Sequence, residues 1–291
     1  MSSFQAKDRA VTIRTPSVAQ LYIDSADRLN PIATTAEQTV IQKGQAIIPG
    51  FFNRVALTEF TFEWFTPNVS GSGGGLGNNT FYYAVGASNT SITIPTSFYT
   101  VSSLLNKTVA LLNNASLGLT WTLSNVSSTT AEGVYLIPNS NANVTLTGTI
   151  MNQLGIAQTA FATTSNTGIL VTYPDIRPCK YLDLTCPQLT YTQEVKDSSS
   201  QNISRDALAR WYFSYNDTEP TAYDSLGFPI LMGYKPFIAR RTFSPAKQIK
   251  WETSLPVAGS LNFNLYNETG ALMPLFSRAT DFLITLQVSE D

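Results

Sequence analysis

The sequence predicts an all-β protein, a single jelly-roll β-sandwich that carries a small α+β insertion domain. Short segments with alternating apolar and polar residues recur towards both ends of the chain. Prolines and polar clusters fill the connections between these segments. A central stretch, residues 78–165, differs in composition and contains the best helix pattern. These three observations favour a jelly roll with an insertion, and an immunoglobulin-like array is the nearest alternative on periodicity alone.

Composition limits the size of the protein and the character of its surface. The chain has 291 residues and is 43% hydrophobic and 13% charged, which fits one large β domain with an insertion or two modest domains. The net charge of −2 gives no reason to expect broad attraction to nucleic acid or anionic lipid. Apolar runs stop well short of the roughly 20 residues of a membrane helix, and the N-terminus lacks an apolar core. We therefore expect no transmembrane segment and no cleaved signal.

The first part of the jelly-roll domain is predicted to span residues 17–77, after an N-terminal arm of residues 1–16. The arm is polar and mixed in charge, so we expect it to be disordered alone or ordered by a neighbour. Strands are predicted at residues 18–23, 39–43 and 53–65, with a polar turn at 24–31. In the third strand, alternation places Val55, Leu57, Glu59 and Thr61 on one face and Phe60, Phe62 and Trp64 on the other.

An outward insertion domain is predicted at residues 78–165. The glycine-rich run at 71–77 marks its boundary, and Lys107 and Glu132 are the only charged residues within it. Leucines and a valine recur at helical spacing after Tyr99, and Thr100 or Ser102 can cap that helix. Strands are predicted at residues 91–95, 119–125 and 133–137, and residues 151–156 close the unit.

The jelly-roll domain is predicted to resume at residues 166–291. Strands are expected at 169–173, 180–186, 207–215 and 247–252, and the alternating segments 260–266 and 282–288 predict a terminal hairpin around turn residues 267–270. Cys179 and Cys186 lie too far apart along one strand for a disulfide, so buried free thiols are expected. Each tryptophan lies in a predicted strand and is interpreted as a core or interface residue: Trp64, Trp121, Trp211 and Trp251.

The residue types present argue against catalysis. The chain contains no histidine, which excludes Ser-His-Asp and Cys-His mechanisms and most zinc sites. The glycine run lacks the Gly-Lys-Ser/Thr ending of a phosphate loop. The nearest acidic pairs are interpreted mainly as solvated turns: Asp24 with Asp27, Glu59 with Glu63, and Asp217 with Glu219. We therefore predict a protein that is not an enzyme and that holds neither metal nor cofactor.

Cations concentrate late in the chain, at Lys235, Arg240, Arg241, Lys247 and Lys250. One interpretation is that they pair with acids of neighbouring subunits or stay solvated. The other is a basic rim that faces packaged nucleic acid, and the sequence leaves both open.

Several segments, in order along the chain, resemble the penton, or minor capsid, proteins of virophages and polinton-like viruses. They are residues 21–28 (LYIDSADR), 92–113, 154–155 (LG), 243–251 (FSPAKQIKW) and 261–290. The resemblance implies a vertical single jelly roll with an outward insertion. It also implies a homopentamer at each fivefold vertex of an icosahedral capsid whose faces are double jelly-roll trimers of the major capsid protein.

This resemblance carries over no catalytic residue, so contact roles are assigned only coarsely. Candidate capsid-facing or genome-facing contacts are Asp24, Asp27, Arg28, Arg240 and Arg241. Residues 78–165 are expected to bind a receptor or fibre, and the protein is expected in the virion after assembly inside the host cell. The main alternative function is a carbohydrate-binding or adhesin module built on a β-sandwich. A sandwich glycosidase is a third, weaker possibility.

Overall fold

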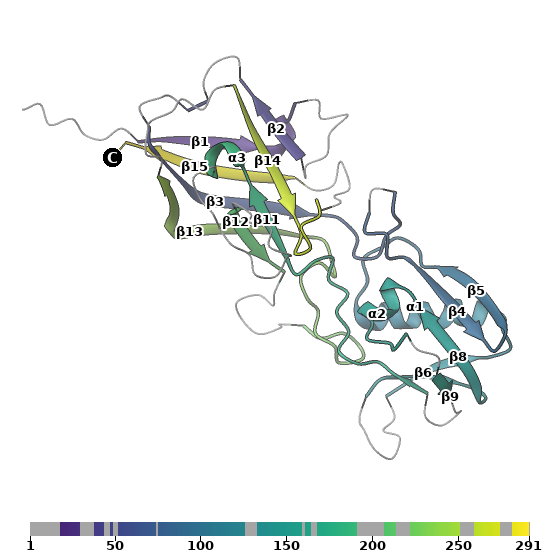
Figure 1. The fold of residues 1–291 in the computed structure, drawn as a ribbon. Coiled ribbons are helices and arrows are strands. Elements are labelled where there is room, and N and C mark those ends of the chain that lie inside the picture. Colours follow the sequence, from purple (N-terminus) through teal and green to yellow (C-terminus); the bar gives the residue numbers. More distant parts are fainter. Residues whose placement is uncertain are drawn as a thin grey trace, which may run out of the picture.

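Two antiparallel sheets face each other across the first hydrophobic core of the protein (Figure 1). The computed structural model describes residues 18–29, 38–43, 47–48, 52–73, 75–125, 133–158, 161–163, 168–190, 207–213, 222–250, 259–273 and 281–290, and all structural statements concern these residues. The predicted arm, residues 1–16, lies outside them, as do Trp251 and the acidic pair Asp217 and Glu219.

Each of these sheets has four described strands. In spatial order, the first sheet contains β1 (Val18–Asp24), β15 (Phe282–Ser289), β3 (Arg54–Trp64) and β13 (Phe237–Lys250). The second contains β12 (Ala207–Tyr212), β11 (Tyr181–Thr185), β14 (Ser260–Tyr266) and β2 (Gln38–Gln42). A short 3₁₀ helix, η1 (Ser25–Asp27), follows β1, and α3 (Pro187–Thr190) follows β11.

The order of these strands is that of a jelly roll. Among the described strands of the sandwich, β11 and β12 are the one consecutive pair that is hydrogen-bonded within a sheet, and the other connections cross between the sheets. An immunoglobulin sandwich pairs several consecutive strands within its sheets, so the alternative from periodicity does not fit. The predicted fold class, an all-β jelly roll with a small α+β insertion, is confirmed.

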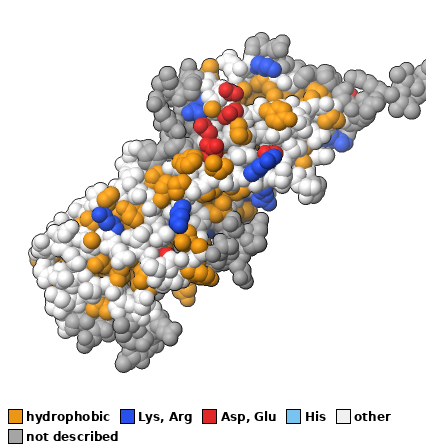
Figure 2. Space-filling view, turned by 180° about the vertical axis from the view of Figure 1, so that it is seen from behind, with side chains coloured by type: hydrophobic (Ala, Val, Ile, Leu, Met, Phe, Trp, Pro, Cys, Tyr) orange, Lys and Arg blue, Asp and Glu red, His pale blue; other side chains and the backbone are white. Residues whose placement is uncertain are grey.

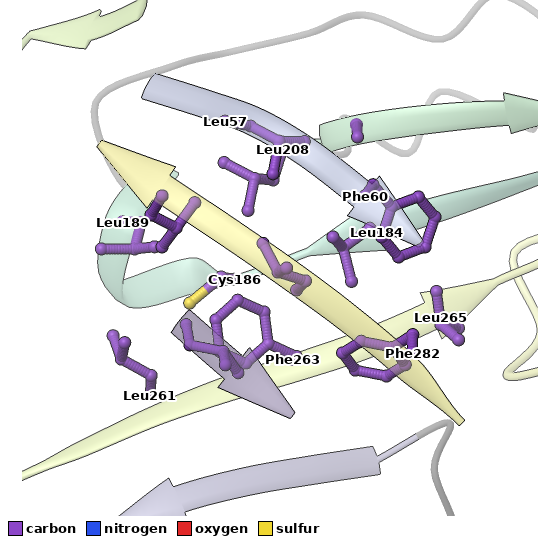
Figure 3. Close-up of a cluster of buried hydrophobic side chains, with 14 of the residues drawn as sticks. Leu57, Phe60, Leu184, Cys186, Leu189, Leu208, Leu261, Phe263, Leu265 and Phe282 are labelled. Atoms are coloured by element: carbon purple, nitrogen blue, oxygen red, sulfur yellow. The ribbon is translucent and has the colours of Figure 1, made fainter. Parts of the chain in front are cut away.

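Aromatic and aliphatic side chains from both sheets fill the space between them (Figure 3). The Phe282 ring of the first sheet lies 6.4 Å from the Phe263 ring of the second, and 6.1 Å from the Phe60 ring beside it. All three side chains are at most 1% exposed. Burying each stabilises the fold by roughly 1.5–3 kcal/mol relative to leaving it in water.

A β-bulge in β3 corrects the faces expected for this strand. The neighbouring strand β15 pairs Thr285 with Glu59 and Leu286 with Leu57, so Thr58 is an extra residue, and its hydroxyl donates to the Thr285 carbonyl over 3.0 Å. The extra residue reverses the alternation. Val55 and Leu57 before the bulge and Phe60, Phe62 and Trp64 after it therefore all enter the core, and the predicted division of the strand between two faces is wrong.

The predicted terminal hairpin is also wrong. Strand β14 pairs with β11 and β2, whereas β15 pairs with β1 and β3, so the two strands lie in opposite sheets. The predicted turn does form, because the Asn267 side chain accepts from the Thr269 and Ala271 backbones. Both strands have a strongly apolar face, and placing them in opposite sheets lets these faces pack against each other.

Both cysteines are buried and free, as predicted. Burial raises the pKa of the Cys186 thiol to about 12 and that of Cys179 well above its ordinary value. Trp64, Trp121 and Trp211 lie in strands β3, β6 (Trp121–Ser124) and β12, and the first two are at most 1% exposed.

A second hydrophobic core is built mainly from the part of the chain between β3 and β11. Its first sheet contains β5 (Ser88–Thr93), β4 (Thr80–Val85), β8 (Ala142–Thr147) and β9 (Phe161–Thr163), and its second contains β10 (Ile169–Leu170), β7 (Tyr135–Pro138) and β6 (Trp121–Ser124). The helices are α1 (Val101–Asn114) and α2 (Thr149–Gln153). In Figure 1 these elements gather at the end of the molecule away from β1 and β2.

Helix α1 forms where the leucine spacing predicts it. Thr100 is the N-cap, and its hydroxyl accepts from the Ser103 backbone while the Ser103 hydroxyl accepts from the Thr100 backbone. This reciprocal pair satisfies two of the free donors at the helix start. Leu104, Leu105 and Leu112 are fully buried against the second core.

Hydrogen bonds hold the two ends of the glycine-rich run together. The Asn78 side chain accepts from the Ser70 backbone and donates to the Asn68 carbonyl and to Gln153 of α2. The Asn68 side chain in turn exchanges two hydrogen bonds with the Tyr99 backbone. Asn68 and Asn78 are nearly inaccessible, so neither could carry a glycan in this fold.

Segments on the C-terminal side of the insertion also join the second core. Strand β10 pairs with β7, and Leu231 and Tyr234 pack in the same cluster. The Asp224 carboxylate accepts from the Ser102 backbone at the start of α1, and the Tyr234 hydroxyl accepts from the Ile176 backbone. The division into residues 17–77 with 166–291, and 78–165, stays a prediction.

An ion pair at the junction between the cores makes stability depend on pH. Burial alone would raise the pKa of Asp175, but the hydrogen bonds and charge of Arg177 outweigh it and hold the pKa below its ordinary value. Arg177 also donates to the Phe213 carbonyl over 2.6 Å. A group with a lowered pKa contributes stability above its unfolded pKa, and that contribution is lost as the pH falls through the folded value.

An Asp175→Asn variant is accordingly expected to be less stable than wild type at pH 7, by at most about 1 kcal/mol because the carboxylate is partly exposed. The difference should shrink as the pH falls through the lowered folded pKa of Asp175, since the wild-type carboxyl is then protonated. Urea unfolding of both proteins across the acid range measures it. A difference that grew on acidification would contradict the assignment.

Candidate interaction surface

The solvent-facing side of the sheet β1-β15-β3-β13 brings together several of the residues singled out from the sequence. Strand pairing aligns Asp24 with Leu283, Leu283 with Thr61, and Thr61 with Arg240. The next row across the same face runs through Tyr22, Thr285, Glu59 and Thr242. These residues alternate with the core positions, so their side chains point away from the sandwich.

A depression of about 630 Å³ lies on this face, which we call the β1 face. Apolar and charged groups both line it, and Asp24, Asp27, Glu59 and Arg240 supply the charges. Tyr22 is 72% exposed and Leu283 46% exposed, so apolar surface remains open to solvent here. Figure 2 shows acidic and hydrophobic side chains gathered over the jelly-roll end, whereas the other end has few charged side chains.

Arg240 is engaged with Glu59 on this face. Its Nε and Nη2 atoms each lie 2.7 Å from a carboxylate oxygen of Glu59. The hydrogen bond from Arg240 lowers the pKa of Glu59, and the same bond raises the pKa of Arg240. Arg240 is 70% exposed, so the pair is accessible to a binding partner.

The Arg28 side chain is buried inside the protein. Its Nη1 donates to the Ser25 carbonyl over 2.7 Å and lies 3.2 Å from the Asp281 carboxylate, with the side chain only 6% exposed. Asp281 also accepts from the Ser25 hydroxyl, and that hydroxyl accepts from the Phe282 backbone. This network joins the end of β1 to the start of β15.

Asp24 precedes η1, and Asp27 is its last residue. The Asp24 carboxylate caps η1 by accepting from the Ala26 backbone over 2.8 Å, and Asp27 lies in the exposed first turn. Both line the depression on the β1 face.

Two of the late cations, Arg240 and Arg241, are successive residues of β13 and so point to opposite faces of the strand. Arg241 pairs with Phe60 across the β13–β3 ladder, whereas Arg240 pairs with Thr61. The Arg241 guanidinium lies 5.3 Å from the centre of the Phe243 ring. Lys235 and Lys250 are exposed, and the side chain of Lys247 lies outside the described set. Contact roles for Asp24, Asp27, Arg28, Arg240 and Arg241 stay predictions.

The outer side of the second sheet holds a polar cluster that sequence patterns missed. Arg210 makes two hydrogen bonds to Asp183, at 2.6 and 2.9 Å, and its guanidinium lies 3.9 Å from the centre of the Tyr181 ring. Asp183 is fully buried, and Tyr212 is 52% exposed beside the Tyr181 ring. The signal in the sequence was an aspartate inside an otherwise apolar strand.

Within the described ranges, no group of three or more Cys, Asp or Glu side chains is arranged to hold a metal ion. The helices in these ranges are also too short or too polar to span a membrane.

No family model and no curated protein sequence matches this chain. The structure is similar to that of the mavirus penton protein. That crystal structure, of the selenomethionine-labelled protein, matches 96% of this chain and 100% of its own, with 9% sequence identity and a TM-score of 0.47. The jelly-roll assignment itself follows from the strand order given above.

Proposed function

We propose that this chain is a structural capsid protein that forms a homopentamer at the fivefold vertices of an icosahedral virion. The observation that carries the proposal is the eight-strand jelly-roll order with a separate α+β unit inserted in the connection between β3 and β11. The penton resemblance of the sequence requires that architecture. Such a protein would act through its shape, beside a double jelly-roll major capsid protein, after assembly inside the host cell.

Three of the segments that carry the resemblance contain contacts that hold neighbouring parts of the fold together. Residues 21–28 contain the end of β1 and the Arg28 network with Asp281. Residues 92–113 contain the capped start of α1, and residues 154–155 form a tight backbone crossing with Thr172. Segments that fix the geometry of the fold are the ones expected to persist between distant relatives.

A ring of five identical subunits uses the same pair of surfaces at every contact, so modest interfaces acting together can hold a vertex. The β1 face offers one such surface, with Tyr22 and Leu283 exposed. The insertion would face outward, and its poorly charged surface suits a receptor or fibre. Contact with packaged nucleic acid is a weaker part of the proposal.

One observation favours the alternative, a carbohydrate-binding or adhesin module. The half-exposed Tyr212 lies beside the Arg210 and Tyr181 stack, and aromatic rings next to polar groups can bind sugars. In that case the protein would act as a monomer, with no need for a closed ring.

The mass of the purified protein tests the proposed function. Five copies of the 31.8 kDa chain give a particle of about 159 kDa, and we expect native mass spectrometry to find it and negative-stain images to show fivefold rings. A matched measurement on a glycan array should give no binding. A monomer of 31.8 kDa that binds a glycan would contradict the capsid proposal and support the alternative.

A further inference from the structure

We propose that the β1 face binds the N-terminal arm of a second copy of this chain, residues 1–17. The proposal deepens the capsid function and rests on it, because it assumes that copies of the chain assemble. The face is the outer side of β1, β15, β3 and β13, centred on the depression lined by Tyr22, Asp24, Asp27, Glu59 and Leu283.

Charge complementarity supports this occupant. The arm contains Lys7, Arg9 and Arg14 against the single carboxylate of Asp8, a side-chain balance of +2. The described lining of the depression contains Asp24, Asp27 and Glu59 against Arg240, a balance of −2. The whole chain has a net charge of −2, so the arm is more basic than the chain average.

The side-chain pattern of the arm also fits this face. In an extended chain, alternate residues share a side. Lys7, Arg9, Val11 and Ile13 therefore fall on one side, with two cations followed by two apolar residues. The β1 face presents the matching mixture, since acids at the Asp24 end of β1 lie beside the exposed Tyr22 and Leu283 side chains.

The length and direction of the arm favour a second copy over the arm's own sheet. Seventeen extended residues reach about 56 Å, whereas the seven residues of β1 span about 23 Å. Pro16 has a fixed negative φ, which conflicts with the positive φ that two-residue hairpin turns require at their first central position. A tight return of the arm along β1 is thus disfavoured, and an extended arm of this length could reach a neighbouring subunit.

Disulfide trapping in the full-length protein tests the proposal. One copy would carry Val11→Cys, on the side of the arm that faces the sheet, and a second, differently tagged copy would carry Gln20→Cys, an exposed residue that lines the depression. The native Cys179 and Cys186 are buried, and their raised pKa values keep them as unreactive thiols. The control partner carries Ser88→Cys, which is exposed on β5 in the insertion.

On mild oxidation of the co-expressed copies, we expect the Val11→Cys and Gln20→Cys chains to link at least about tenfold faster than the control pair, since docking raises the local thiol concentration to the millimolar range. Arg9→Glu in the arm should slow the linkage, and Asp27→Arg on the face should restore it. A charge swap that fails to restore linkage would show that the acids do not receive the arm.

Two other results would overturn the proposal. Linkage confined to one chain in a Val11→Cys, Gln20→Cys double variant would mean that the arm folds back, which overturns the proposal. Equal rates with the control, as expected for an arm that binds nucleic acid elsewhere, would overturn it too. Native mass spectrometry of the same sample separates this inference from the proposed function. A pentamer without linkage refutes the docking alone, linkage without a pentamer refutes the vertex role alone, and a monomer without linkage refutes both.

Discussion

A Gly155→Ala variant is expected to lose about 3–5 kcal/mol of stability or to fail to fold. Gly155 has a φ of +70°, and a Cβ atom added there would lie 1.5 Å from the Thr172 carbonyl oxygen. The two backbones are held together at this point, because the Thr172 N–H and hydroxyl both donate to the Gly155 carbonyl, at 3.1 and 2.8 Å. The obstacle is backbone, so no side-chain rotation can relieve it.

Gly118→Ala is the matched control. Gly118 lies in the same part of the chain with a φ of +83°, but nothing lies within 4 Å of the added Cβ atom. Its cost should be the conformational term alone, about 1–2 kcal/mol. Chemical unfolding followed by tryptophan fluorescence compares the variants, since Trp121 reports on the second core. If the two variants were equally stable, the close crossing at Thr172 would not be essential to the fold.

Local patterns predicted the elements whose cause is local. Helix α1 follows from leucines at helical spacing behind a capping residue, and Leu104, Leu105 and Leu112 are buried as that spacing requires. The strand segments of the sandwich were found by alternation. Strands β4 and β8 of the insertion were not predicted, because β4 reads as a mixed aromatic run and β8 as a polar one. These segments form strands because they pair with each other, and neither sequence alone shows the alternation of a strand.

The errors in the sandwich arose from contacts between distant parts of the chain. One extra residue, Thr58, reverses the faces of β3, and only the pairing with Thr285 reveals it. Strands β14 and β15 follow each other across a plausible turn, yet their partners are β2, β11, β1 and β3. Alternation tells which residues face a core but not which sheet a strand joins.

In the candidate site, too, the sequence did not reveal contacts between distant parts of the chain. Asp24, Asp27 and Arg240 were selected on charge and position, and the alignment of β1, β15, β3 and β13 brings them to one depression although over 200 residues separate them. Glu59, which pairs with Arg240, was interpreted as a solvated acid. Arg28 was grouped with the contact candidates, and sequence gave no indication that Asp281 and Ser25 would enclose its side chain.

An Arg210→Met variant is expected to lose about 3 kcal/mol of stability, the second large effect. Asp183 is fully buried at the centre of the second sheet, and Arg210 is its bidentate partner at 2.6 and 2.9 Å. Removing one partner of a buried ion pair leaves the other charge in a poorly solvated place, which typically costs 3–5 kcal/mol. The lower end applies because the Arg210 side chain is 27% exposed and water already reaches it. Urea unfolding of the variant measures the loss.

A comparison of the stability lost in the two single variants and in the double variant tests this explanation further. Asp183→Leu should cost less than Arg210→Met, because the guanidinium it leaves behind is partly solvated and still lies 3.9 Å from the Tyr181 ring. The double variant should recover most of the loss, since an apolar pair of similar volume removes the uncompensated charge together with the ion pair. If the double variant were as unstable as the sum of the two single ones, the pairing of the charges would not be what stabilises the sheet, and packing of the arginine stem over Tyr181 would account for the effect instead.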